Sequence, residues 1–176
     1  MLCYHKLNII FREDHAMSAI SAVLAARELL DHLTPLKTDC GRLCGAACCQ
    51  GDENTGMLLF PGEETLYENC AFADVLPLDY FLGSTQAHLL VCRGRCEREM
   101  RPLACRLFPL FLKFKEEGVT KLRIDARAKS VCPLTDYGIK SLDPDFKQAA
   151  RKAYDLLLED EACAAYLKAL DEAFSL

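Results

Sequence analysis

Closely spaced cysteines constrain this chain more than any other feature of its sequence. One block reads CGRLCGAACC over residues 40–49, a second reads CRGRC over residues 92–96, and single cysteines follow at positions 105 and 132. Such blocks bring several thiols together at a small entropic cost of loop closure, and structural zinc sites use the same two-part arrangement. We therefore predict eight metal ligands: Cys40, Cys44, Cys48, Cys49, Cys92, Cys96, Cys105 and Cys132.

The total cysteine content argues against a secreted protein held together by disulfides. The chain has 11 cysteines in 176 residues, or about 6%, and a short disulfide scaffold typically has more than about 8–10%. The first residues lack the features of a secretion signal, and no later segment has the roughly 18–20 uninterrupted apolar residues of a membrane span. We expect a cytoplasmic protein with no membrane partner, in a reducing compartment that favours metal binding over disulfides.

Local sequence limits how the thiols can be shared among sites. Gly41 and Gly45 lower the helix propensity of the first block and predict a loop that wraps closely around a metal. Adjacent side chains diverge in a helix or a strand, so Cys48 and Cys49 rarely reach the same ion. If both bind, eight cysteines supply two sites of four thiolates, or one cluster and one ion. The cofactor is then zinc or iron, and the iron alternative includes an iron–sulfur cluster with a redox role.

The other three cysteines belong to no block. Free cysteine is among the most buried residue types and packs as a small hydrophobe. Cys163 falls on the apolar face of an expected helix, and Cys3 and Cys70 stand apart in the sequence. We predict that all three pack as hydrophobic residues. For the eight clustered cysteines, a reversible disulfide switch is the alternative to metal binding.

Arginines accompany the second cysteine block. Residues 92–106 contain five arginines and two glutamates, a local net charge of +3. Guanidinium groups lower the pKa of nearby thiols and stabilise an anionic metal–thiolate centre, which is the role we favour. The alternative is an RNA- or protein-binding module that uses this patch, although the net charge of −5 disfavours a general nucleic-acid binder. The arginines of the 93–106 patch are Arg93, Arg95, Arg98, Arg101 and Arg106.

Hydrophobic periodicity and turn signals predict a single small α+β domain, in which helices bracket the cysteine-rich centre. An N-terminal leader and helix occupy residues 1–35, with the helix running from Asp14 to about His32. A helical pair occupies residues 143–176, because Asp143 followed by proline is typical of a helix start.

The irregular metal-binding centre between these helices spans residues 40–133. One or two short β-hairpins are expected within it. The first pairs residues 80–82 with 88–92, and the second pairs 111–115 with 120–125 across a turn that contains a glycine.

Three motifs stand out in this centre: the double cysteine that ends the first block, LLFPGEE at 58–64 and, most specific of the three, RPLACRLFP at 101–109. Together they resemble the CxxCxxCC (YkgJ-type) cysteine-cluster family of bacterial and archaeal proteins, described as zinc- or iron-chelating. The resemblance covers about residues 40–133. The first cysteines are separated by three residues here and commonly by two in the family.

This resemblance implies zinc or iron binding and an accessory role in protein modification, because the module also occurs in larger proteins similar to flagellin lysine methylases. It ranks six cysteines as the leading ligands, followed by Cys92 and Cys132. The six are Cys40, Cys44, Cys48, Cys49, Cys96 and Cys105.

Signatures of common enzyme classes are missing from the sequence. There is no glycine-rich phosphate loop and no HExxH motif. The first block is not CxxxCxxC, and the chain is shorter than the about 250 residues of a full (β/α)8 barrel, which disfavours radical S-adenosylmethionine chemistry. The sequence therefore predicts a metal-binding protein to which no reaction and no protein partner are assigned.

Overall fold

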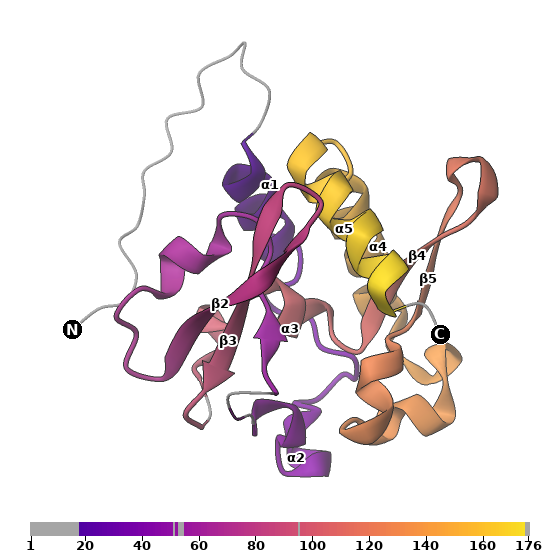
Figure 1. Ribbon diagram of the computed structural model, residues 1–176. Helices are drawn as coiled ribbons and strands as arrows, with labels where there is room; N and C mark the ends of the chain where they lie inside the picture. Colours follow the sequence, from indigo (N-terminus) through magenta and orange to yellow (C-terminus); the bar gives the residue numbers. More distant parts are fainter. Residues whose placement is uncertain (1–17, 51, 53–54, 95, 175–176) are drawn as a thin grey trace.

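The computed structural model describes residues 18–50, 52, 55–94 and 96–174. Within them, helices and two small antiparallel sheets form a mixed α+β fold, which confirms the predicted class (Figure 1). The main hydrophobic core lies between the sheets and three longer helices that pack against one another. These helices are α1 (Ala19–Glu28), α4 (Pro144–Leu157) and α5 (Glu161–Phe174).

The C-terminal helices begin where the sequence predicts. Asp143 Oδ1 accepts hydrogen bonds from the N–H groups of Asp145 and Phe146 at 2.9 and 3.2 Å, so it caps α4 with Pro144 in the first turn. In the same way, Asp160 accepts from the N–H of Cys163 at 2.8 Å at the start of α5. A side-chain acceptor satisfies N–H groups that the helix itself leaves without partners, and so it sets where each helix starts.

Helix α1 is shorter than predicted. It begins after Ser18 and ends at Glu28, while Asp14, the predicted start, lies outside the described residues. The predicted end near His32 is wrong, because residues 29–32 continue as turns with i→i+3 hydrogen bonds such as Leu30 N–H to the Arg27 carbonyl at 3.0 Å.

The structure contains two β-hairpins in the predicted places, but the predicted pairing of the first is wrong: residues 88–92 pair with 73–77, whereas residues 81–82 pair with 85–86. Strands β2 (Ala73–Leu82) and β3 (Thr85–Cys92) pair around a tight turn, and the first of them is longer than predicted. Strand β1 (Met57–Leu58), which the sequence did not indicate, adds to β3 on its other edge. Strands β4 (Leu110–Phe114) and β5 (Thr120–Ile124) form the second sheet.

Short helices carry most of the cysteine-rich centre. The first block forms α2 (Gly41–Cys44) and the 3₁₀ turn η1 (Ala47–Cys49), so the prediction of a loop at Gly41 is wrong. Asp39 Oδ1 accepts from the Gly41 N–H at 3.1 Å, which stabilises the start of α2. Gly45 and Ala46 both adopt left-handed backbone, with φ of 61° and 57°, and separate α2 from η1. Helix α3 (Leu103–Leu107) follows the second block.

Two of the three cysteines predicted to pack as hydrophobic residues do so. Cys163 is completely buried on α5 and Cys70 is 5% exposed, whereas Cys3 lies outside the described residues. Cys163 Sγ contacts the Ala19 carbonyl oxygen at 3.8 Å, so this thiol packs α5 against α1. In the described part of the chain, none of the helices has the length and apolar character needed to cross a membrane.

Candidate metal centre

The eight clustered cysteines come from five separate segments that meet at one end of the molecule. Figure 1 shows α2 at the foot of the fold, beside the 3₁₀ turns that follow β5. Cys132 lies between the 3₁₀ helices η5 (Ala126–Ser130) and η6 (Pro133–Tyr137). Cys92 ends β3, Cys96 lies in the loop after it, and Cys105 lies within α3.

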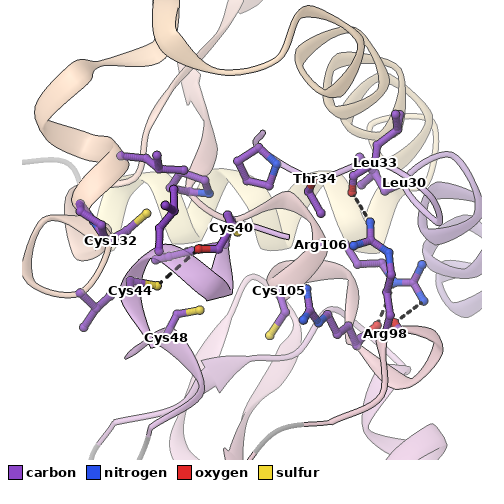
Figure 2. Close-up of a pocket in the computed structure, with 18 residues that line it drawn as sticks. Leu30, Leu33, Thr34, Cys40, Cys44, Cys48, Arg98, Cys105, Arg106 and Cys132 are labelled. Carbon is purple, nitrogen blue, oxygen red and sulfur yellow. Dashed lines mark hydrogen bonds between the residues drawn. The ribbon is translucent and has the colours of Figure 1, made fainter. Parts of the chain in front are cut away.

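Four of these cysteines surround one space. A cavity of about 50 Å³ is lined by Cys40, Cys44, Cys48 and Cys132, and also by Cys105, by the arginines Arg98, Arg101 and Arg106, and by apolar side chains. Figure 2 shows the first four around a common space, whereas the sulfur of Cys105 points away from it. A volume of this size accommodates a metal ion or a few water molecules. We call Cys40, Cys44 and Cys132 the cavity group.

The thiols of the cavity group lie within electrostatic reach of one another. Burial raises the pKa of Cys40, and charge at Asp39, Cys132 and Cys44 raises it further. Burial also raises the pKa of Cys132, to which Cys44 adds a smaller contribution. Cys40 and Cys132 are therefore protonated at neutral pH while no metal is bound.

A second set of four cysteines lies around the end of β3. Gln50 forms an isolated antiparallel bridge with Arg93, which brings the end of η1 beside the end of β3. This bridge joins the first cysteine block to the second. Cys49, Cys92 and Cys96 are not among the described residues that line the cavity, whereas Cys105 is. We call this set the strand group: Cys49, Cys92, Cys96 and Cys105.

Each thiol of the strand group affects the others electrostatically. Burial raises the pKa of Cys92 to about 11, and Cys96 and Cys49 add to the shift. Burial likewise raises the pKa of Cys105, with contributions from the other three. It also raises the pKa of Cys96, with a contribution from Cys49. Arginine was predicted to lower thiol pKa values here, but its smaller effect is outweighed by burial.

Cys48 lies between the two groups. A hydrogen bond with the adjacent Cys49 thiol and burial raise the pKa of Cys48, and Cys105 and Cys40 raise it further. It is thus electrostatically coupled to one member of the cavity group and to two members of the strand group. Its side chain lines the cavity, and the residue is exposed at the surface.

The cysteines are separate thiols in the described part of the chain. None of the ten described cysteines forms a disulfide with another, and no three Cys, His, Asp or Glu side chains there are close enough to hold a metal ion as they stand. The thiols make local contacts instead, as in the 3.8 Å contact of Cys44 Sγ with the Cys40 carbonyl oxygen. Metal coordination therefore requires rotation of these side chains between staggered rotamers.

Arg101 supplies positive charge to the strand group. Its guanidinium lowers the pKa of the Cys96 thiol, in part through a hydrogen bond, while charge at Cys96, Cys49 and Cys105 raises the pKa of Arg101 against the effect of burial. Its Nε is buried and has no hydrogen-bond partner in the described part of the chain. A buried N–H without a partner is costly, and a negatively charged metal–thiolate centre would provide one. The donor set and this arginine therefore fit a metal centre.

Arg106 is a structural residue beneath the loop that carries Cys96. Its guanidinium donates to the carbonyl oxygens of Arg101, Arg98 and Glu99 at 2.9, 3.3 and 3.0 Å. It also donates to the Arg27 carbonyl at 3.3 Å and forms an ion pair with Asp31. One planar cation thereby joins the cysteine loop to helix α1 and the turn after it.

Glu63 supports the other side of the same loop. Its carboxylate is completely buried and accepts from the Leu103 N–H at 2.7 Å and from the Phe60 N–H at 3.3 Å. Arg27 faces it, with 3.6 Å between Nη1 and Oε1. Glu63 thus caps α3, the helix that carries Cys105. Burial raises the pKa of Glu63, and the charge of Arg27 opposes that rise.

Two further arginines of the 93–106 patch, Arg98 and Arg93, are also engaged within the fold. Arg98 donates to the carbonyl oxygens of Asp31, at 2.7 Å, and Leu33. Arg93 donates to Asp74 Oδ2 at 2.8 Å on the exposed face of the sheet. Arg95 lies outside the described residues. The patch therefore mainly organises the cysteine loop.

Sequence reasoning missed the supporting residues Arg27, Asp31 and Glu63. A signal was present for two of them. Arg27 occupies a position on the apolar face of α1, and Glu63 follows the apolar-proline element at 58–61. A charged residue in an apolar pattern indicates a buried charge with a partner, but the partner is distant in sequence.

Comparisons with known proteins add no relatives. No family model, no curated protein and no solved structure matches this chain.

Proposed function

We propose that this protein chelates zinc or iron through its clustered cysteine thiolates. The observation that carries the proposal is the convergence of eight thiols from distant segments, five of them lining a small cavity, beside Arg101, whose buried Nε–H has no hydrogen-bond partner in the described part of the chain. Several of these thiols are close enough that ionisation of one raises the pKa of its neighbours, and a bound metal cation would offset that repulsion. The motif resemblance to the CxxCxxCC (YkgJ-type) family favours the same function.

The chemistry of the ligand set restricts the choice of metal. Thiolates are soft ligands that select zinc, copper(I) and iron–sulfur centres over magnesium or calcium. In the zinc form, closed coordination by cysteines would contribute free energy of folding to a region built from short 3₁₀ turns. In the iron form, hydrogen bonds and charge from residues such as Arg101 would tune the reduction potential.

Metal content of anaerobically purified protein tests the proposal. We expect stoichiometric zinc or iron in the wild type, less metal in Cys105→Ala, and wild-type content in Cys163→Ala. Both substitutions remove one thiol, but Cys163 is buried between helices away from the cluster, so it is the control for loss of a thiol alone. Equal metal content in the two variants, or a wild type without metal, would contradict the ligand assignment.

The colour of the same sample separates the two metals. A colourless protein with stoichiometric zinc excludes the iron–sulfur form. A brown protein with sulfide-to-iron absorption excludes the purely structural zinc form.

Metal binding should release protons and strengthen as pH rises. Burial and neighbouring thiols raise the thiol pKa values, that of Cys92 to about 11, so the metal-free thiols carry protons at pH 7. Each thiolate ligand then releases about one proton on binding, and affinity weakens by roughly tenfold per proton for each unit that pH falls. Isothermal titration calorimetry with Zn²⁺ in buffers of different ionisation enthalpy measures the number released. A value near zero would show that the thiols are already ionised.

A further inference from the structure

Two groups of thiols approach the cluster from different sides of the fold. The cavity group comes from α2 and the turn before η6, and the strand group comes from the ends of η1 and β3, the loop after β3, and α3. Four cysteines, Cys40, Cys44, Cys48 and Cys132, surround the cavity. Cys49, Cys92 and Cys96 are not among its described lining residues, and the sulfur of Cys105 points away from it (Figure 2). In η1, the adjacent residues Cys48 and Cys49 lie on these two different sides.

The geometry of η1 explains how adjacent cysteines can serve different groups. A 3₁₀ helix has about 3 residues per turn, so neighbouring side chains point about 120° apart around its axis. Cys48 accordingly lines the cavity, whereas Cys49 does not line it. Cys49 precedes Gln50, whose bridge with Arg93 places this end of η1 beside Cys92 at the end of β3. The three-residue gap before Cys48, with left-handed Gly45 and Ala46, sets this orientation of η1 relative to α2.

We infer that the eight cysteines divide into two metal sites, each with four thiolates. The strand group, Cys49, Cys92, Cys96 and Cys105, holds one ion. The cavity group, Cys40, Cys44 and Cys132, holds the other, with Cys48 as its fourth ligand. This inference rests on the proposed metal binding and adds the number of ions and the allocation of ligands.

The two sites differ in access to solvent. The cavity site depends on the exposed Cys48 for its fourth ligand and opens onto the cavity. The four cysteines of the strand site are each partly buried, and Arg101 lies near them. Metal therefore leaves the cavity site first when a chelator competes, and two phases of release are expected.

Titration of the metal-free full chain with Co²⁺ under anaerobic conditions tests the division. Co²⁺ takes the tetrahedral thiolate geometry of zinc, and its absorption bands report each bound ion. We expect two equivalents in the wild type and in Cys163→Ala. Cys132→Ala and Cys92→Ala should each bind about half as much, and the double variant should bind almost none.

The ion that each single variant keeps is its own control for folding, because a misfolded chain would lose both. Cys48→Ala should retain the strand site and lose the ion that a chelator removes first in the wild type. One equivalent in the wild type, or complete loss in either single variant, would overturn the two-site division and leave metal binding intact. A wild type that binds no Co²⁺, Zn²⁺ or iron would overturn the proposed function itself.

Discussion

Replacing Arg106 by methionine should lower the free energy of unfolding by about 3–5 kcal/mol, the usual cost of breaking a buried charge network. The guanidinium is 5% exposed and joins three carbonyl oxygens of the cysteine loop to α1 and Asp31. Methionine is similar in length but donates no hydrogen bond, so these oxygens would be buried without a donor. Urea denaturation followed by circular dichroism measures the change.

Two variants separate the geometric role of Arg106 from its charge. Arg106→Lys keeps the charge but loses the planar fork, so we expect it to recover only part of the stability. Arg93→Gln removes an arginine of the same patch whose side chain is 57% exposed, and it should not change the unfolding transition. An Arg106→Met protein as stable as the wild type would contradict the structural role.

Replacing Glu63 by alanine should destabilise the fold by a similar amount, about 3–5 kcal/mol. The substitution removes the acceptor for two buried N–H groups, those of Leu103 and Phe60, and the carboxylate that faces Arg27. Because Leu103 is the first residue of α3, loss of the cap should also loosen the helix that carries Cys105. Hydrogen exchange of residues 103–107 should therefore accelerate more than that of α4.

The neighbouring glutamate provides the control for this variant. Glu64→Ala changes the next residue of the same 3₁₀ helix, at a partly exposed position, and should cost about 0.5 kcal/mol or less. Glu63→Gln keeps one carbonyl acceptor without the charge, so an intermediate loss is expected. Equal stabilities of Glu63→Ala and Glu64→Ala would show that the buried carboxylate does not support α3.

The supporting residues also explain why helix α1 matters to the cysteine loops. Arg27 and Asp31 reach the loop after β3 through Glu63 and Arg106. Arg27 Nη2 also donates to the Glu99 carbonyl at 3.1 Å. The helical core therefore positions the loop before any metal binds, which lowers the entropic cost of assembling the ligands.

Elements with strong local signals could be predicted from the sequence. Asp143 and Pro144 specify the start of α4, and the glycine turn before Thr120 joins β4 to β5, because caps and turns depend on adjacent residues. Helix α2 could not be predicted, since its stability comes from the Asp39 contact and from tertiary packing rather than from the propensity of Gly41. Strand β1 has only two residues, and its pairing with β3 depends on a distant segment.

The sequence by itself determined the α+β class and the cysteines that are candidates for metal binding, because these follow from residue type and spacing. Only the tertiary structure decided which cysteines line the cavity and which lie beside the end of β3, since this depends on the turn of η1 and on the bridge from Gln50 to Arg93. The tertiary structure also determined the different roles of two arginines. Arg101 lies near the thiols, whereas Arg106 donates hydrogen bonds to backbone carbonyl oxygens of the loop. Long-range packing sets these contacts, and the residues adjacent to a side chain in the sequence do not specify a contact with a residue forty or more positions away.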